Sequence, residues 1–378
     1  MPKRIYLSSP YTHGEEMQFV KEAFDTNWLA PVGKNIDGLE AEINAYINKG
    51  LDGAPYKSLA LISGTSALHL ALKLADIKPG ETVFCSDSTY CATAFPVSYE
   101  GGKQVFVDAE RDSWNMDPNA LELAFQKYPK TRIVMFAHLY GTPGKMDELL
   151  DVCKRHNAIL IEDAAEALAS SYHGRSCGTF GTYNAISFNG NKIITTSGGG
   201  MLVTADAAAW KKALYLATQA REPVPWFEHP DIGYNYRMSN VIAGIGRGQL
   251  IHLDEHRAMK KHIYDTYKEG FKGLPVSMNP VPDGCESNYW LSCILIDKGV
   301  NVKPMEVLDK LKTVANAEGR PLWKPMHMQP VFKGSDCISL EDKPVGTDLY
   351  ERGLCLPSDL HMDDDDMKLI IDTVRSCF

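Results

Sequence analysis

At 378 residues the chain is too long for one compact core, and we expect two domains or a large domain with a smaller one appended. Hydrophobic residues make up 44% and charged residues 23%, which are ordinary globular values that exclude a disordered or fibrous protein. The formal net charge of −9 argues against a nucleic-acid binder, because such proteins concentrate lysine and arginine against the phosphates.

The nine cysteines and the N-terminal residues bear on the compartment. No two cysteines form a C-x-x-C pair, which favours a reduced, cytoplasmic protein with buried thiols. Residues 1–10 hold no apolar stretch long enough for a signal peptide. No segment approaches about 18 uninterrupted apolar residues, so we also expect no membrane span.

The first 50 residues predict two amphipathic helices, at 15–26 and 39–48. In the first helix, apolar residues repeat at helical spacing: Met17, Val20, Ala23 and Phe24. The loop between the helices carries Trp28, whose ring either anchors the core or forms one wall of a pocket. Both interpretations stay open at this point.

A strand at 59–62 leads through Ser63-Gly64-Thr65-Ser66 into a helical pattern at 67–74. The free N–H groups at such a helix N-terminus bind phosphate well, and the hydroxyls of Thr65 and Ser66 lie beside them in sequence. Alternatively, Ser63 or Thr65 only caps the helix. The residues favour the two interpretations about equally.

An alternation of buried strands and helices follows. We predict strands at 81–85, 104–107, 132–136 and 158–161, with helices at 118–127 and 146–156 among them. This rhythm indicates a parallel sheet covered on both faces, with ligands bound at the carboxyl ends of its strands. Polar residues follow three of these strands: 87–90, 138–141 and 162–166.

A carboxylate directly after a buried strand, such as Asp163, needs a partner if it is buried. It either caps the next helix or pairs with a cation, and a protonated aromatic ring nitrogen is one such cation. Its neighbour Glu166 lies three residues further along the same segment.

Lys192 lies where a polar loop meets a buried β-branched run, five residues after Ser187. Partial burial lowers the pKa of a lysine and frees its amine to act as a nucleophile. The three glycines at 198–200 let the backbone pass close to a bound group. Taken alone, the lysine is more often a solvated side chain and the three glycines more often a turn, so either feature by itself favours that interpretation.

The remainder predicts a connecting helix at 250–267, a strand at 288–296 and helices at 304–315 and 367–374. The residues His252 to His256 match H-x-x-E-H, a zinc-peptidase pattern. We reject that match because the run is a mixed-charge exposed helix without a third ligand motif nearby, and we expect no metal. We place a large domain at 1–250 and a small one at 251–378.

Taken together, these motifs resemble those of the DegT-type sugar aminotransferases, which use pyridoxal 5'-phosphate. The resemblance runs from about residue 7 to residue 329 and rests on 63–66, Tyr90, 162–166, Ser187 to Lys192 and 233–238. Residues 320–327 are most similar to the bacillosamine-type branch, which acts on UDP-2-acetamido-4-keto-2,6-dideoxyhexose. The implied fold is fold type I, aspartate aminotransferase-like: a large α/β domain with a mostly parallel seven-stranded sheet, and a smaller C-terminal α/β domain.

The resemblance also implies roles for individual residues. Lys192 would join the cofactor aldehyde and later move a proton, and Asp163 would keep the pyridinium nitrogen charged. The remaining cofactor-binding residues would be Gly64, Thr65, Ser66 and Ser187 at the phosphate, Tyr90 on the ring face, Glu166 near the ring oxygen, and Asn235 at the neighbouring subunit's cofactor. A homodimer with shared active sites follows from the last of these.

The implied substrates are a nucleotide sugar and L-glutamate as amino donor. Candidate substrate-binding residues are Trp28, Asn189, Arg237, Arg320, Trp323 and His327. Relatives that dehydrate sugars carry histidine in place of Lys192, so the lysine favours transamination. Two alternatives remain: a dehydratase or lyase using the same cofactor, and a non-catalytic regulatory protein that keeps the fold.

Overall fold

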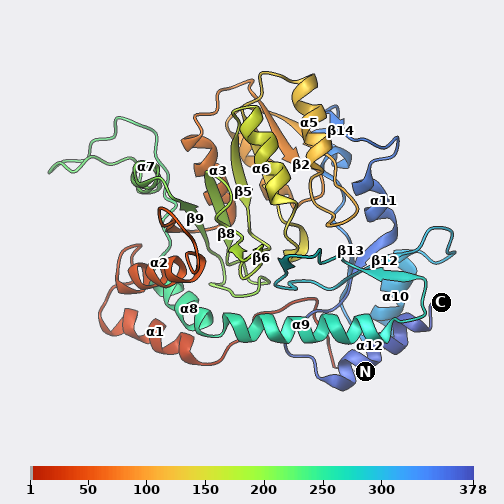
Figure 1. Ribbon diagram of the computed structural model, residues 1–378. Coiled ribbons are helices and arrows are strands. Elements are labelled where there is room, and N and C mark those ends of the chain that lie inside the picture. The colour runs from red at the N-terminus through yellow and green to blue at the C-terminus, as the bar shows by residue number, and fades with distance from the viewer. Residues whose placement is uncertain (1–2) are drawn as a thin grey trace.

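The computed structural model describes residues 3–378 and contains one large sheet with helices on both faces (Figure 1). The strand order is β1-β9-β8-β5-β4-β2-β3-β14. All neighbours from β8 to β14 pair in parallel, whereas β9 is antiparallel to both β8 and β1. The strands are β1 (Lys57–Leu61), β2 (Thr82–Ser86), β3 (Lys103–Val107), β4 (Ile133–Ala137), β5 (Ile159–Asp163), β8 (Tyr183–Ser187), β9 (Gly200–Thr204) and β14 (Cys337–Ile338).

The mostly parallel sheet is confirmed, and it contains one strand more than the seven expected. The eighth, β14, is two residues long and comes from the C-terminal part of the chain, where it pairs with β3. A strand of two residues is too short to show a hydrophobic periodicity in the sequence. It forms because it pairs with β3, not because its residues favour a strand.

Side chains that alternate along the central strands pack into two separate hydrophobic cores, one on each face of the sheet. Val83 and Cys85 of β2 pack with α3 and α7, whereas Phe84 between them packs with α5 and α6. A third cluster joins α2 and α8 to the β1, β8 and β9 edge of the sheet. The covering helices are α2 (Lys34–Ile47), α3 (Gly64–Leu74), α4 (Phe95–Tyr99), α5 (Pro118–Lys127), α6 (Met146–Arg155), α7 (Ala207–Ala217) and α8 (Asn240–Ile251).

The C-terminal part forms a second, smaller layer around a four-stranded antiparallel sheet, β10-β12-β15-β13. The long helix α9 runs along the edge of the molecule beneath both sheets (Figure 1). The elements of this part are α9 (Leu253–Gly270), β10 (Val276–Met278), β12 (Cys293–Ile296), α10 (Pro304–Ala315), β13 (Arg320–Pro321), α11 (Val345–Arg352), β15 (Gly353–Cys355) and α12 (Asp364–Arg375).

The remaining elements are short or peripheral. A small sheet has the order β11-β6-β7, and its strands are Cys285–Glu286, Ser171–Tyr172 and Arg175–Ser176. Helix α1 spans Glu15–Asp25, and 3-10 turns occur at Cys91–Thr93, Leu139–Gly141, Met326–Met328 and Pro330–Phe332. None of the helices within residues 3–378 combines the length and the apolar character that a membrane crossing requires.

Two local predictions were wrong. The connecting helix predicted at 250–267 is interrupted at His252, where α8 ends and α9 begins. The strand predicted at 288–296 covers only Cys293–Ile296, because Tyr289 takes a left-handed backbone with φ of 55°, which a strand cannot contain. The helix predicted at 15–26 is confirmed as α1, in which Ala23 is buried whereas Met17 is 67% and Phe24 60% exposed.

The N-terminal and C-terminal parts of the chain exchange short segments. Ile5 bridges to Ala317 and is buried in the C-terminal hydrophobic cluster, while β14 returns to the large sheet. The division into 1–250 and 251–378 falls at the end of α8 and stays a prediction.

Candidate active site

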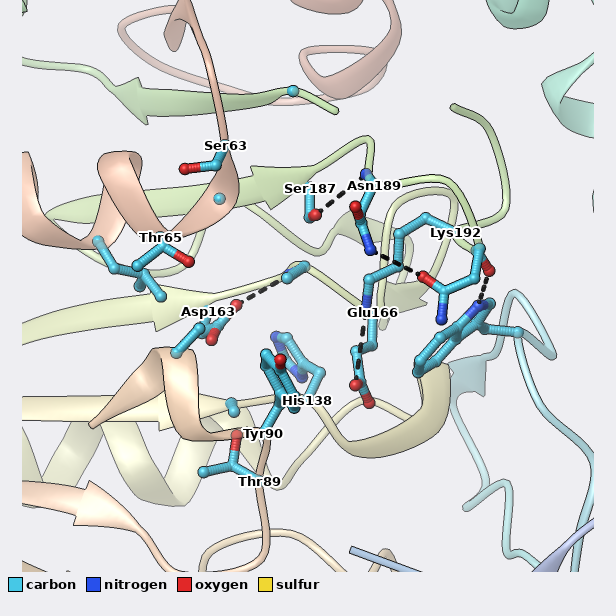
Figure 2. Close-up of a pocket in the computed structure, with 18 of the residues that line it drawn as sticks. Ser63, Thr65, Thr89, Tyr90, His138, Asp163, Glu166, Ser187, Asn189 and Lys192 are labelled. Atoms are coloured by element: carbon cyan, nitrogen blue, oxygen red, sulfur yellow. Dashed lines mark hydrogen bonds and ion pairs between the residues drawn. The ribbon is translucent and has the colours of Figure 1, made fainter. Parts of the chain in front are cut away.

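A cavity of about 520 Å³ opens at the carboxyl ends of β2, β4, β5 and β8, where the sequence places its polar residues (Figure 2). Residues from the start of α3, the lysine loop and the C-terminal part complete its walls. The predicted site residues that line the cavity are Gly64, Thr65, Tyr90, Asp163, Glu166, Ser187, Asn189, Lys192 and Trp323.

The amine of Lys192 lies between a carboxylate and an aromatic face. Its Nζ is 3.6 Å from Glu166 Oε1 and 3.8 Å from the centroid of the Trp290 ring. Burial lowers the pKa of Lys192, although the charge of Glu166 acts in the opposite direction. The structure therefore favours an amine that loses its proton more readily than a surface lysine, as a nucleophile requires.

The carboxylate of Glu166 is fixed by a hydrogen bond to the oxygen that does not face Lys192. Oε2 accepts a hydrogen bond of 2.8 Å from the main-chain N–H of Tyr140, whereas Oε1 is buried without a hydrogen-bond partner among the described residues. This oxygen faces the cavity and forms an ion pair with Lys192 at 3.6 Å (Figure 2). A bound group with a hydroxyl or a protonated amine would satisfy it.

Asp163 ends β5 and is buried with hydrogen bonds but no cation. Its carboxylate accepts from Thr93 Oγ1 at 2.7 Å and from the N–H of Ala165 at 3.0 Å. Burial raises the pKa of Asp163. Within residues 3–378 no lysine, arginine or histidine nitrogen forms an ion pair with it, so the cavity offers a cation a buried counter-charge.

The start of α3 supplies the third feature, a helix N-terminus facing the cavity. Gly64 and Thr65 belong to the first helical turn, whose N–H groups have no acceptor within the helix. Strand β9 packs against this turn so closely that a Cβ on Gly200 would lie 2.4 Å from the nitrogen of Gly64. Ser187 lies beside the same turn, and together these groups suit a phosphate.

Both interpretations of the 63–66 motif have support. The Ser63 hydroxyl accepts from the N–H of Ser66 at 3.0 Å, and the Ser66 hydroxyl accepts from the N–H of Ser63 at 3.1 Å, which forms a capping box. The hydroxyl of Ser66 is thus engaged in capping and does not line the cavity. A contact of Ser66 with phosphate stays a prediction.

Arg320 and Trp323 lie in contact near the cavity and carry nitrogen donors without hydrogen-bond partners in the 3–378 range. The guanidinium of Arg320 lies 3.4 Å from the centroid of the Trp323 ring, and the Trp323 ring is 5.1 Å from that of Tyr90. Arg320 Nε and Nη2 and Trp323 Nε1 are buried without hydrogen-bond partners among the described residues. Buried donors of this kind indicate an anionic or polar ligand.

The other substrate candidates lie outside the cavity in this chain. His327 Nδ1 is 2.6 Å from Asp87 Oδ2, and this hydrogen bond raises the pKa of His327. Arg237 pairs with Glu40, and Trp28 is 53% exposed. Asn235, predicted to bind the neighbouring subunit's cofactor, also lies outside the cavity, is exposed and accepts from Gln219 Nε2 at 3.1 Å.

Sequence reasoning missed two residues of the site, Trp290 and Thr93, and gave His138 no specific role. Trp290 was assigned to a strand, whereas its ring lines the cavity against Lys192. Thr93 holds Asp163, and His138 lines the cavity with its Nε2 hydrogen-bonded to Glu162 at 2.8 Å. The polar run 138–141 pointed to His138, but nothing in the sequence distinguishes Thr93 or Trp290 from core residues.

The H-x-x-E-H run does acquire a third imidazole in the folded chain. The ring of His13 stacks on that of His252 with centroids 3.5 Å apart and an interplanar angle of 4°. Rings stacked in parallel direct their nitrogen lone pairs along separate planes, which is poor geometry for sharing one tetrahedral ion. The absence of a metal stays a prediction.

Comparisons with known proteins agree on one family. Residues 10–375 match the model of the DegT/DnrJ/EryC1/StrS aminotransferase family. EpsN of Bacillus subtilis, whose own assignment as a pyridoxal phosphate-dependent aminotransferase is provisional, is 43% identical over 100% of this chain and 97% of its own. GDP-perosamine synthase of Caulobacter vibrioides is 34% identical over 97% of this chain and 96% of its own. The crystal structure of the aminotransferase TlmJ from Streptoalloteichus hindustanus superposes with a TM-score of 0.87 at 26% identity, covering 98% of both chains.

Proposed function

The chain belongs to the DegT/DnrJ/EryC1/StrS aminotransferase family, and on that premise we propose that it transfers an amino group from L-glutamate to the 4-keto carbon of a nucleotide-linked 6-deoxy sugar. The protein is a sugar aminotransferase that uses pyridoxal 5'-phosphate. The proposed acceptor is UDP-2-acetamido-2,6-dideoxy-4-keto-hexose. The observation that carries the proposal is the presence, in one cavity, of a largely buried lysine and a buried carboxylate that has no cationic partner among residues 3–378.

The residues of the cavity fit the cofactor. Asp163 offers a buried negative charge for the protonated ring nitrogen, and the N–H groups of Gly64 and Thr65 with the Ser187 hydroxyl suit the phosphate. Tyr90, which is half exposed on the cavity wall, offers a ring face for stacking. When bound, the cofactor supplies an electron sink for the carbon that gains or loses a proton.

The protein's own part in the reaction is to bind, to orient and to move a proton. Lys192 provides an amine whose burial favours the neutral form, so it accepts a proton at the reacting carbon and returns it. Glu166, at 3.6 Å, stabilises the ammonium form of Lys192 between these transfers. Asp163 lies on the opposite side of the cavity from the lysine, where it would hold the protonated ring nitrogen of the cofactor (Figure 2).

Support for an anionic substrate comes from Arg320. Its two unpaired nitrogens are buried beside Trp323, which lines the cavity, so a carboxylate or phosphate arriving there would pair with them. GDP-perosamine synthase among the relatives supports a nucleotide sugar as acceptor. The choice of UDP and of the 4-keto position rests on the resemblance of residues 320–327 to the bacillosamine-type branch.

A homodimer with shared active sites is part of the proposal. Asn235 is exposed outside the cavity, and a group of large apolar side chains is exposed as well: Met17, Phe24, Trp28, Trp226 and Phe227. Exposed aromatic and apolar residues of this kind suit a protein interface. Coexpressing Lys192→Ala with Asn235→Ala chains tests sharing, because only mixed dimers can hold one site with both native residues.

The direct test is product formation. Purified protein is incubated with the cofactor, L-glutamate and the UDP-4-keto sugar, and the product is identified by mass spectrometry and NMR. Amino-sugar formation that requires both glutamate and Lys192 supports the proposal. Conversion of the sugar without glutamate would instead indicate the dehydratase or lyase alternative, and amination of only GDP- or dTDP-linked sugars would correct the nucleotide.

A further inference from the structure

Both main-chain carbonyls that flank Lys192 are held by side chains from distant parts of the chain. The carbonyl of Asn191 accepts hydrogen bonds from Trp290 Nε1 at 2.6 Å and from Ser8 Oγ at 3.0 Å. The carbonyl of Ile193 is 2.9 Å from His256 Nδ1. A loop that would otherwise pivot around the lysine is therefore fixed on each side of it.

Trp290 is the one of these residues that also touches the lysine side chain. The Lys192 ammonium nitrogen lies 3.8 Å from the centroid of the indole ring, well within the range of a cation–π contact. Trp290 is only 1% exposed, so little water competes for this contact. The same indole thus binds the lysine through its face and the lysine loop through its edge.

The segment that carries Trp290 is itself locked to the cavity wall. The N–H of Trp290 donates to Asn288 Oδ1 at 2.9 Å. Asn288 Nδ2 donates to the carbonyls of Glu166 at 2.9 Å and Leu168 at 2.8 Å. The left-handed backbone of Tyr289 between them turns the indole toward Lys192 instead of along a strand. The position of Glu166 and that of Lys192 are therefore set by one short segment.

We propose that Trp290 is a positioning residue for Lys192, which stabilises the ammonium form with its ring face and fixes the lysine loop with its Nε1–H. The proposal rests on the function proposed for Lys192. Trp290 itself exchanges no proton and forms no bond with a substrate, because its indole N–H is already donated to Asn191. Its effect reaches the reaction only through the place and the charge of the lysine amine.

The charged groups around the Lys192 amine determine how removal of the Trp290 ring should change the pH at which the amine loses its proton. Glu166 and Asp163 favour the ammonium form, whereas burial and the charge of Arg320 oppose it. The face of the Trp290 indole also favours the ammonium form of Lys192. Replacement of Trp290 by leucine keeps the site apolar but removes the π face, so the amine of Lys192 should lose its proton about half to one and a half pH units lower.

The test uses cofactor-free protein, so its failure is distinct from failure of the proposed function. The rate at which acetic anhydride acetylates Lys192 is followed by peptide mass spectrometry across pH in the native protein, Trp290→Leu and Trp290→Phe. Phenylalanine keeps a ring face but has no N–H donor, so it separates the two contributions. The matched control is Trp210→Leu, because Trp210 Nε1 also donates to a main-chain carbonyl, that of Ser58 at 2.9 Å, in a different core cluster.

We expect the titration midpoint of Lys192 to fall in Trp290→Leu, to fall by less than half as much in Trp290→Phe, and to stay unchanged in Trp210→Leu. With cofactor and substrates present, Trp290→Phe should lower kcat about tenfold or more through the released loop while KM changes little. An unchanged or raised midpoint in Trp290→Leu would overturn the proposal. Should that variant fail to fold by near-UV circular dichroism, native values of both midpoint and kcat in Trp290→Phe would overturn it.

Discussion

Replacing Asp163 by asparagine should affect stability and cofactor binding in opposite senses. The carboxylate is 6% exposed and has no cationic partner among the described residues, so in the cofactor-free protein its charge is a cost. Asparagine can keep both hydrogen bonds: its Oδ1 accepts from the N–H of Ala165, and its Nδ2 donates to Thr93 Oγ1. The Thr93 hydroxyl is then free to donate to Thr89, 2.7 Å away.

The magnitudes follow from these contacts. Removing an unpaired buried charge while its hydrogen bonds are preserved should leave the free energy of unfolding unchanged or raise it by about 1 kcal/mol. The loss of a buried ion pair with the cofactor ring should weaken cofactor binding by about 2–4 kcal/mol, which is about 30- to 1000-fold in Kd.

Asp108 provides the matched control. It is also a buried carboxylate after a strand, and burial raises its pKa as well. Its oxygens accept from three donors: the N–H groups of Val345 at 2.7 Å and Gly346 at 2.9 Å, and Ser339 Oγ at 2.8 Å. Asparagine there turns its amide toward N–H donors, so Asp108→Asn should lose about 1–3 kcal/mol of stability without a direct effect on cofactor affinity.

Both variants are measured in the same two assays. Urea unfolding of cofactor-free protein gives the stability, and titration of the visible absorbance with pyridoxal 5'-phosphate gives the Kd. An unpaired charge at Asp163 is ruled out if Asp163→Asn destabilises the protein as much as Asp108→Asn does, and an ion pair with the cofactor is ruled out if the Kd stays within about twofold of the native value.

Three further predictions concern other charged groups. Glu166→Gln removes a charge 3.6 Å from Lys192 Nζ; the Coulomb attraction is on the order of 4 kcal/mol before water in the cavity weakens it, so the acetylation midpoint of the lysine should fall by about one to two pH units, and a rise would contradict the assignment. Arg320→Ala should raise the KM of an anionic substrate about tenfold or more at unchanged cofactor Kd; native kinetics would remove Arg320 from the site. Burial lowers the pKa of Lys260 from 10.5 to about 7. Between pH 7 and 10.5 the Lys260 amine binds its proton more tightly in the unfolded chain than in the folded one, so the free energy of unfolding should rise across this range by an amount on the order of 4 kcal/mol. Lys260→Met should remove this rise, as measured by urea unfolding at pH 7 and pH 10.5; a rise that persists in the variant would contradict the prediction.

The sequence predicts best what is decided locally. Helices 118–127 and 304–315 match α5 and α10 to the residue, because a proline begins each and the apolar spacing is regular. Part of the cavity was also foreseeable: Asp163 lies at the end of a predicted strand and Thr65 at the start of a predicted helix, and the carboxyl ends of parallel strands meet at one edge of a sheet. Ser187 was named only through the family resemblance.

Contacts between distant segments account for what could not be predicted. The ring of Trp290 reaches Lys192 only because Tyr289 takes a left-handed backbone, and no side-chain pattern signals that turn. Thr93 holds Asp163 across 70 residues of sequence. The pairing of β14 with β3 likewise depends on the return of the chain to the large sheet.

The most direct test of the central claim follows the nitrogen atom. Protein loaded with pyridoxal 5'-phosphate is given L-glutamate carrying an isotope-labelled amino group together with UDP-2-acetamido-2,6-dideoxy-4-keto-hexose, and the sugar product is examined by mass spectrometry. We expect an amino sugar that carries the label and is absent with Lys192→Ala. A sugar product without the label, or equal product from Lys192→Ala, would contradict it.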